Sequence, residues 1–171
     1  MAVLITDFSE NAPSLAKRLL GCYLCFRDDA GVLHREMINE TEAYFGEEDT
    51  ACHAHRGKTA RNAPLYEKGG VAYVYLCYGM YDLLNVVSGP DGHPEAVLIR
   101  GAGKYNGPGK LTKALGISRK ENLCSLCGDR LWIEEKDHEP KFISTARIGI
   151  DYAEKDDRER LWRFVVLTEE K

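Results

Sequence analysis

Residues 71–100 constrain the fold most, because three strand-forming runs follow one another there with only short turns between them. The runs are VAYVYLC and MYDLLNVV, on either side of Gly79, and EAVLIR, which follows a GPDGHP turn. Valine and tyrosine favour strands, whereas glycine and proline favour turns. The pattern predicts a β-meander of antiparallel strands with a bend at Gly79.

The residues before the meander predict a helix followed by a hairpin. The helix is expected to begin near Asn11, to tolerate Pro13 in its first turn and to end at Gly21. Residues 22–26 and 32–44 then predict two strands around a DDAG turn.

The remaining segments complete an α+β pattern. Residues 46–70 lack periodicity and predict a long ordered loop, which in a compact domain is usually functional. A glycine-rich stretch at 101–110 leads into a short helix closed by Gly116. Further strands are expected at residues 130–134, 147–151 and 162–167. Antiparallel strands with few, irregularly placed helices indicate a single compact α+β domain over the whole chain, 1–171, rather than a doubly wound sheet.

Composition excludes several classes of protein. The 171 residues are 44% hydrophobic and 29% charged, which is typical of a globular chain rather than a disordered one. No apolar run approaches the ~20 residues that a membrane-spanning helix needs. The first residues lack the basic segment and the cleavage site of a secretory signal, so we expect the six cysteines to stay reduced in a cytoplasmic setting.

Charge is segregated along the chain, although the net charge is only −4. Residues 36–49 hold six acidic and no basic side chains, residues 54–64 hold three basic and no acidic ones, and residues 99–120 hold six basic and no acidic ones. A phosphate-contacting face beside an acidic functional strand would use this pattern. Solvated faces of unrelated elements are the other explanation.

Two short patterns resemble known sites but fit them poorly. The Cys-x-x-Cys pairs at 22–25 and 124–127 would bind zinc only if four thiolates converged, and buried, reduced cysteines explain them better. The GPGKLT motif at 107–112 has Lys104 where a P-loop needs its first glycine and Leu111 where it needs serine or threonine. We therefore expect no metal and no nucleotide cofactor, and only a helix N-terminus suited to a backbone phosphate.

One segment in the middle of the chain holds the side chains best suited to catalysis. Glu40 and Glu42 are two residues apart and share a face of a strand. Crowded carboxylates raise one another's pKa or require a basic partner, as a general base often does. Tyr73 and Tyr75 also share a face and either stack on a planar ligand or belong to a half-buried core. With His53 they fit an enzyme that extrudes and encloses a base.

Several segments, in order over nearly the whole chain, are similar to one known family. They are ETEAYFGEEDTACHAHRGKTARN at 40–62, VAYVYLCYGMYDLLNVV at 71–87, AVLIRG at 96–101, GPGKLTKALGI at 107–117, RIGIDYA at 147–153 and LWRF at 161–164. On these segments the chain resembles the alkyladenine (3-methyladenine) DNA glycosylases of bacteria and mammals. The long TEAY-x-G-x-x-D-x-A-x-H-A pattern followed by YVY-x-x-YGMY is far more specific than the short motifs above.

The resemblance implies a fold, an activity and a substrate. The fold is a compact domain with a mostly antiparallel sheet, flanking helices and a β-hairpin that enters the DNA minor groove. The activity is monofunctional hydrolysis of the N-glycosidic bond of alkylated or deaminated purines, such as 3-methyladenine, 7-methylguanine and hypoxanthine, which leaves an abasic site. Cationic lesions are expected to be better substrates than neutral ones, because a positively charged base is already a good leaving group.

The resemblance also implies roles for five residues near the expected site. Glu42 matches the general base that activates a water against the sugar carbon. Tyr44 and His53 match the walls of the base pocket, Tyr75 matches the ring on the other side of the flipped base, and Asn85 matches the residue that screens against normal guanine.

Further residues match expected DNA contacts. Tyr78 matches the wedge that fills the gap left in the duplex, and Arg100 matches a residue that reaches the DNA backbone. Lys58 and Lys110 occupy basic positions expected near phosphates. The chain departs from the family pattern after the last meander strand, where Lys104 replaces an acidic residue and would strengthen phosphate binding.

The expected partner is double-stranded DNA that carries damaged purines. We expect a monomer that acts without a cofactor and without a membrane, associated with the nucleoid in a bacterium or located in the nucleus of a eukaryote. The alternative is a non-catalytic nucleic-acid-binding module on the same scaffold, which would keep the basic residues and tyrosines but would not need Glu42.

Overall fold

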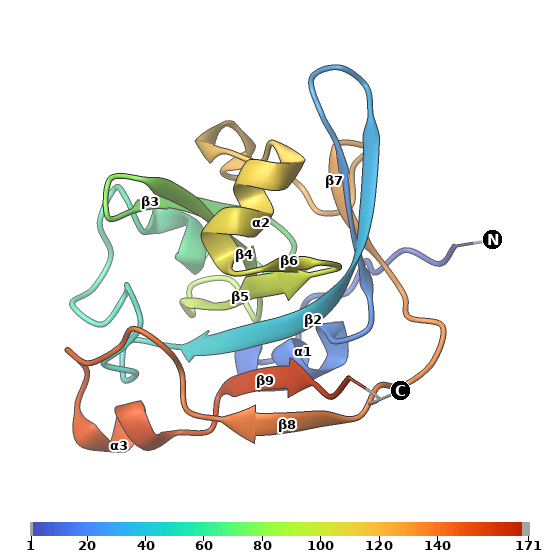
Figure 1. Ribbon diagram of the computed structural model, residues 1–171. Coiled ribbons are helices and arrows are strands. Elements are labelled where there is room, and N and C mark those ends of the chain that lie inside the picture. The colour runs from blue at the N-terminus through green and yellow to red at the C-terminus, as the bar shows by residue number, and fades with distance from the viewer. Residues whose placement is uncertain (1, 169–171) are drawn as a thin grey trace.

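The computed structural model describes residues 2–168 and has an α+β fold, as the sequence predicted. Figure 1 shows strands that curl around a shared interior, with short helices packed against them. The helices are α1 (Ala12–Leu19), η1 (Ala63–Tyr66), α2 (Pro108–Leu115), η2 (Arg119–Glu121) and α3 (Lys155–Glu159). Within this described part of the chain, none of the helices has the length and apolar character needed to cross a membrane.

The strands form one antiparallel sheet. They are β1 (Tyr23–Arg27), β2 (Leu33–Phe45), β3 (Ala72–Cys77), β4 (Tyr81–Val87), β5 (Glu95–Ala102), β6 (Tyr105–Asn106), β7 (Leu131–Glu134), β8 (Phe142–Thr145) and β9 (Arg163–Val166). The main path runs β3-β4-β5-β2-β1-β7, with β6 paired to β5, and β9 paired to both β2 and β8. The predicted meander is β3, β4 and β5, and the predicted N-terminal hairpin is β1 and β2.

Strand β2 is the central element, because two different parts of the sheet use it. Its first half pairs with β1, and its second half pairs with β5 on one side and β9 on the other. The register against β5 shifts on both sides of Glu40, which marks a bulge. Figure 1 shows β2 passing from the upper hairpin into the lower part of the molecule.

Local sequence signals account for the ends of the two longer helices. The Asn11 side chain accepts a hydrogen bond of 2.9 Å from the Ser14 backbone N–H and caps α1, whose first turn contains a proline. Helix α2 ends at Gly116, which has the left-handed φ of 84° that glycine adopts without a steric cost. Both helix predictions are confirmed.

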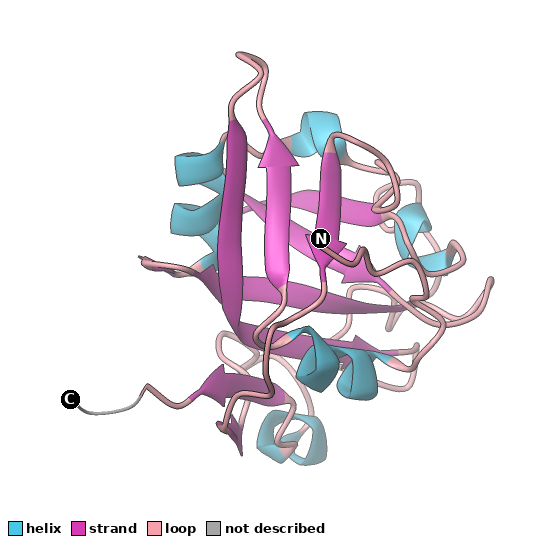
Figure 2. Ribbon diagram, turned by 90° about the vertical axis from the view of Figure 1, so that its right-hand side faces the viewer, coloured by secondary structure: helices cyan, strands magenta, loops and turns pink. Residues whose placement is uncertain are grey.

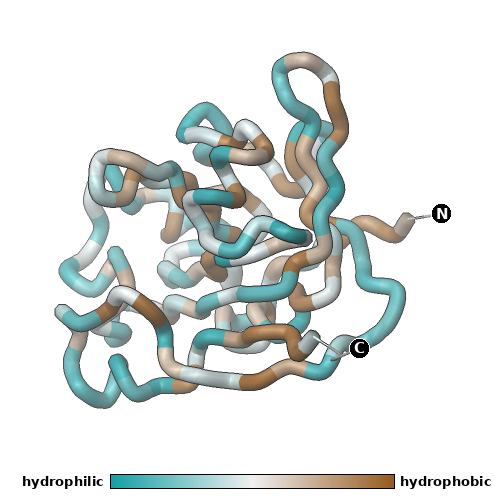
Figure 3. Tube along the Cα trace, in the orientation of Figure 1, coloured by the Kyte–Doolittle hydropathy of each residue, from teal (hydrophilic) through white to brown (hydrophobic). Residues whose placement is uncertain are grey.

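One apolar core lies between the sheet and these two helices. Helix α1 packs on β2 and β5, and α2 packs on β4 and β5, so residues from both helices join the same buried cluster. Figure 2 shows the strands at the centre of the molecule with helices around them. In Figure 3 the hydrophilic colours follow connecting segments such as the one between β7 and β8.

The prediction of a strand at residues 147–151 is wrong. This segment is an irregular loop, because Gly149 has a left-handed φ of 76° and the Ile148 N–H bonds to a side chain instead of a neighbouring strand. The edge strand that pairs with β9 is β8, which the sequence analysis missed. The charged stretch before β9 contains the short helix α3, which was also missed.

Candidate active site

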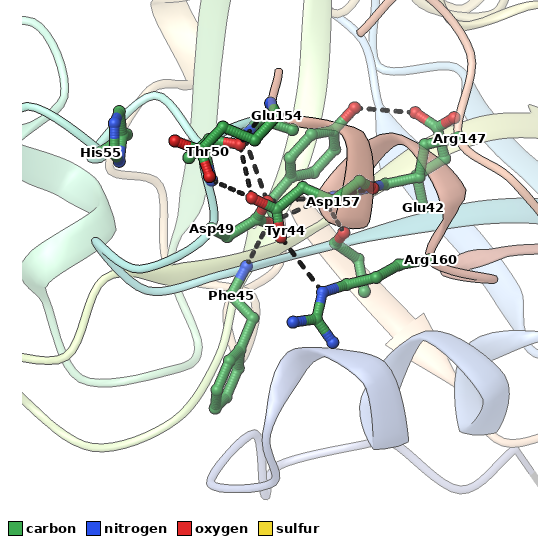
Figure 4. Close-up of polar contacts among 12 residues, drawn as sticks. Glu42, Tyr44, Phe45, Asp49, Thr50, His55, Arg147, Glu154, Asp157 and Arg160 are labelled. Carbon is green, nitrogen blue, oxygen red and sulfur yellow. Dashed lines mark hydrogen bonds and ion pairs between the residues drawn. The ribbon is translucent and has the colours of Figure 1, made fainter.

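The Glu42 carboxylate is buried in the second half of β2 and held by hydrogen bonds from two directions. The Tyr44 hydroxyl donates to Oε1 at 2.9 Å, and the Ile148 backbone N–H donates to Oε2 at 2.6 Å. Figure 4 shows the Tyr44 hydroxyl directed at the carboxylate. The side chain therefore has a fixed orientation.

Arginine side chains neutralise the Glu40 and Glu42 carboxylates of β2. Arg100 on β5 donates from Nε to Glu40 at 3.0 Å, and its Nη1 lies 3.4 Å from Glu42 Oε1. Arg163 on β9 donates to the same Glu40 oxygen at 2.8 Å. The expectation that Glu40 and Glu42 share a face is confirmed, because Arg100 contacts both. The predicted DNA contact of Arg100 is not tested by this geometry.

The environment makes the Glu42 carboxyl a stronger base than an ordinary glutamate. Burial is the largest influence and raises the pKa of Glu42, while the charge of Arg100 and the hydrogen bonds from Ile148 and Tyr44 oppose the rise. A carboxylate with a raised pKa accepts a proton more readily, and its hydrogen bonds keep it aimed in one direction.

A cavity of about 700 Å³ lies in front of this carboxylate. Tyr44, Arg100 and Ile148 contact Glu42 and also line the cavity, so Glu42 lies directly behind its wall. The wall is strongly aromatic, with contributions from the β2 to β4 strands and the surrounding loops: Tyr44, His53, Tyr73, Tyr75, Tyr78, Tyr81 and Tyr152. Aromatic walls with a few polar groups are typical of a site for a planar ligand.

His53 and two tyrosines of β3 form one side of the cavity. His53 Nδ1 lies 3.1 Å from the Tyr73 hydroxyl, and its ring centroid lies 4.3 Å from that of Tyr75. The rings of Tyr73 and Tyr75 are 5.3 Å apart, which confirms that they share a face. Desolvation, together with the charge of Arg61, lowers the pKa of His53, so the imidazole is neutral at neutral pH.

Asn85 on β4 also lines this cavity. It is buried, and its side-chain amide donates to the Tyr73 backbone carbonyl at 3.2 Å. This bond holds Asn85 against the neighbouring strand. The predicted site residues Glu42, Tyr44, His53, Tyr75 and Asn85 thus gather around one cavity, and their roles remain predictions.

Tyr78 lies at the tip of the β3–β4 hairpin and points into solvent. Its side chain is 86% exposed, and its backbone has a left-handed φ of 52°, which is uncommon for a residue other than glycine. Met80 beside it is also exposed. Tyr78 therefore presents an exposed aromatic ring on a tight turn at the rim of the cavity.

The two lysines predicted to contact DNA are both exposed. Lys110 lies in the first turn of α2 and lines the edge of the cavity. Lys58 lies in the loop before η1, with its Nζ 5.4 Å from the ring centroid of Tyr66. Both positions leave the ammonium groups free to meet a phosphate.

The sequence analysis missed the loop that follows β8. Arg147 is buried and paired with Asp49, Ile148 holds Glu42, and Tyr152 donates its hydroxyl to the Ala51 carbonyl at 2.8 Å. The RIGIDYA segment is part of the resemblance, but residues 147–151 within it were expected to form a strand. The same motif is the signal that could have identified this loop.

The cysteines are free thiols. Burial raises the pKa of Cys22 to about 11 and that of Cys25 to about 12, so both thiols are protonated at neutral pH. Among residues 2–168, no three His, Cys, Asp or Glu side chains are grouped as metal ligands.

Comparison with known proteins gives a consistent result. The family model described as methylpurine-DNA glycosylase matches residues 6–105 and 102–170. A relative from Chlamydia pneumoniae is 43% identical, with 95% of this chain and 93% of the relative covered. One from Sodalis glossinidius is 44% identical, with 88% of each covered, and one from Methanocella arvoryzae is 42% identical, with 96% and 92% covered. All three are provisionally named 3-methyladenine DNA glycosylases.

Proposed function

The chain belongs to the methylpurine-DNA glycosylase family, and on this basis we propose that it excises damaged purines from duplex DNA by hydrolysis of the N-glycosidic bond. The observation that carries the proposal is the buried Glu42 carboxylate, oriented by hydrogen bonds directly behind an aromatic cavity. A binding module would not need an oriented base at this place.

The reaction begins with extrusion of the damaged nucleotide from the duplex. The base enters the cavity, where Tyr44 lies against one face and Tyr75 against the other. His53, which the resemblance grouped with Tyr44, would border the Tyr75 side, because its ring centroid lies 4.3 Å from that of Tyr75. Unpairing and unstacking cost a few kcal/mol, least for a damaged pair. Tyr78 occupies the gap in the duplex and offsets part of this cost.

Glu42 then acts as the general base. Its carboxylate takes a proton from a water molecule while the water oxygen bonds to the sugar carbon C1′. The bond between C1′ and the purine nitrogen breaks, and its electron pair leaves with the purine. The products are the free base and an abasic site, and the proton stays on Glu42 until it is returned to solvent.

We further propose that cationic alkylated purines are better substrates than neutral ones. A cationic base accepts the electron pair of the broken bond without prior protonation, and it stacks well on electron-rich rings. A neutral purine needs a proton donor, and the cavity side chains are poor ones. The lowered pKa of His53 keeps the imidazole neutral, and burial raises the pKa of Tyr44 well above its ordinary value. Equal excision rates for 3-methyladenine and hypoxanthine would contradict this part of the proposal.

Other residues would select and hold the substrate. Asn85 would collide with the 2-amino group of guanine and so exclude the normal base. The β3–β4 hairpin would enter the minor groove, with Lys58 and Lys110 on flanking phosphates. Arg100 lines the cavity, so its N–H groups would reach the backbone of the extruded nucleotide itself.

We place this activity on chromosomal DNA in the cytoplasm, carried out by a monomer. Light scattering of the DNA complex tests the stoichiometry.

The direct test is single-turnover release of free base from a duplex that carries one alkylated purine. We expect wild type to release the base and Glu42→Gln to be slower by at least ~10²-fold, the effect of losing a general base. The variant should still bind the lesion duplex, because the amide keeps the size of the side chain. Glu40→Gln is the matched control on the same strand and should lose far less activity.

The possible outcomes separate the alternatives. Lesion-dependent binding without any release of base by wild type would favour a non-catalytic module. Full activity of Glu42→Gln would leave the glycosylase activity in place and remove Glu42 as its base.

A further inference from the structure

Asp49 and Arg147 form a buried ion pair next to the proposed active site. Arg147 Nη1 lies 2.7 Å from one carboxylate oxygen of Asp49, and Nη2 lies 2.9 Å from the other. The Arg147 side chain is 0% exposed and the Asp49 side chain is 1% exposed. This is the bidentate geometry that arginine forms with a carboxylate and that lysine cannot reproduce.

The pair joins the end of β2 and the residues just after it to the loop after β8 and to α3. Arg147 also donates to the Ala43 carbonyl of β2 at 2.9 Å and to the Asp157 carbonyl of α3 at 3.2 Å. Asp49 in turn accepts from the backbone N–H of Phe45, at the end of β2, at 3.0 Å. Figure 4 shows Asp49 and Phe45 within this group of polar contacts.

These contacts end at the groups that hold Glu42. The guanidinium of Arg147 lies 4.9 Å from the ring centroid of Tyr44, whose hydroxyl bonds to Glu42 Oε1. The next residue after Arg147 is Ile148, whose N–H bonds to Glu42 Oε2. Arg147 thus lies against one donor and directly precedes the other, and the two donors bond to different oxygens of the Glu42 carboxylate.

We propose that the Asp49–Arg147 pair is a positioning device for the Glu42 carboxylate. The inference rests on the proposed function, because it gives the pair its role in the step that Glu42 performs. Stability alone accounts poorly for the pair, since well-packed apolar side chains can replace a buried ion pair at little or no cost. The guanidinium of Arg147, held by Asp49, bonds to the backbone carbonyls of Ala43 and Asp157. In this position the next residue, Ile148, directs its N–H at Glu42.

The charge of Arg147 also affects the base. It lowers the pKa of Glu42 and so opposes the effect of burial, together with Arg100 on β5. The other titratable groups that influence Glu42 are Tyr44 on β2, Tyr75 on β3 and Tyr152 in the loop after β8, all neutral at ordinary pH. Position and charge can therefore be separated by substitution, because lysine keeps the charge and methionine removes it.

The test measures single-turnover excision, lesion-duplex affinity and the pH dependence of the rate. For Arg147→Lys we expect excision to fall at least tenfold, with the dissociation constant for DNA within threefold of wild type and the acidic limb of the pH profile unmoved. For Arg147→Met we expect a larger fall and an acidic limb shifted to higher pH. The control is Arg130→Lys, which disturbs a 2.8 Å ion pair with the buried Glu121 beside β7 and should retain the wild-type rate.

If the arginine variants do not fold, a second pair of variants tests whether the Ile148 N–H positions the Glu42 carboxylate. Ile148→Pro removes the N–H that bonds to Glu42, and Ile148→Ala keeps it while shortening the side chain. We expect the proline variant to lose at least ten times more activity than the alanine variant. Equal rates for the two would overturn the positioning role.

Two failures remain distinguishable. If wild type releases base and Arg147→Lys releases it equally fast while unfolding at a lower temperature, the pair is structural only and the proposed function stands. If wild type itself releases no base from any lesion duplex, the proposed function fails, and the positioning role fails with it.

Discussion

The surroundings of Glu42 and the tip of the β3–β4 hairpin border the same cavity but are built in opposite ways. Around Glu42, charged groups are buried and each is paired, as in the contacts of Glu42, Arg147 and Asp49. At the hairpin tip an aromatic ring, Tyr78, is exposed on a backbone with left-handed φ. The first region is buried and paired within the protein, whereas the second exposes an aromatic ring that the proposed function places in the DNA duplex.

The difference separates two tasks. A base that must take a proton in a fixed direction works best where its neighbours cannot move, because no reorganisation is then needed during the reaction. A surface that must enter a duplex works best where side chains are free of internal partners. Substitutions in the buried region should therefore change the chemical rate, and substitutions at the tip should change binding.

Arg100→Met should give the largest effect in the buried region after loss of Glu42 itself. We expect excision at neutral pH to fall about 10²-fold, comparable to loss of a preorganised electrostatic contact. The acidic limb should also move to higher pH, because the charge of Arg100 lowers the pKa of Glu42. A pH–rate profile and a binding isotherm measure both effects, with Lys113→Met on the exposed side of α2 as the control.

One result for Arg100→Met would contradict the division of tasks between the buried region around Glu42 and the hairpin tip. If Arg100→Met leaves the rate at saturating enzyme unchanged and instead weakens binding with a smaller salt dependence, Arg100 acts as a phosphate contact. The buried region would then share the task of binding with the hairpin.

Tyr78→Ala should weaken affinity for the lesion duplex about tenfold, since stacking of a ring on a base contributes ~1–3 kcal/mol. Fluorescence anisotropy with labelled DNA measures the loss, and Tyr78→Phe should restore affinity because it keeps the ring. The free energy of unfolding should not change, because the side chain is exposed. A loss of stability without a loss of affinity would assign Tyr78 to the fold instead.

Gly79→Ala should destabilise the protein by about 1 kcal/mol, because alanine does not adopt a left-handed φ as readily as glycine. The φ of Gly79 is 65°, and a Cβ there would meet no atom within 4 Å, so the whole effect is conformational. Gly128→Ala is the matched control, since its Cβ would make an ordinary contact of 3.6 Å without a left-handed φ. Urea denaturation of both variants should show a loss only for the first.

The smallest effect concerns the stability of Glu42→Gln as a function of pH. The pKa of Glu42 is raised in the folded state, so the protonated form favours folding, and this contribution disappears as pH rises through the raised pKa. Glutamine remains neutral throughout. The variant should gain stability relative to wild type as the pH rises above 4.5, the ordinary pKa of a glutamate, and through the raised pKa of Glu42, as urea titrations at several pH values would show. A constant difference would mean that burial of Glu42 has no net cost.

The sequence predicted those parts of the fold that have local signals. The helix start near Asn11, the stop at Gly116 and the bend at Gly79 are properties of a few neighbouring residues, and all three predictions were confirmed. The spacing of Glu40 and Glu42 likewise placed both carboxylates on one face.

The parts that were not predicted depend on contacts between distant segments. Ile148 and Ile150 alternate as in a strand, but the segment bends because its polar groups bond to Glu42 and to Asp49. Ile148 lies 106 positions from Glu42, and Arg147 lies 98 positions from Asp49. Nothing in the local sequence pattern identifies such distant partners. The orientation of the carboxylate was therefore beyond local sequence analysis.

This separation has a consequence for the synthesis of the protein. Glu42 precedes Ile148, a donor that holds its carboxylate, by 106 positions, so the ribosome adds Ile148 long after Glu42. Strand β9, which pairs with the same part of β2, follows later still. Because chains are synthesised at roughly 5–20 residues per second, an incomplete chain carries the aromatic residues for seconds before its base can be aligned. The Glu42 carboxylate therefore gains this hydrogen bond only after the segment that contains Ile148 has been made and has folded back onto β2.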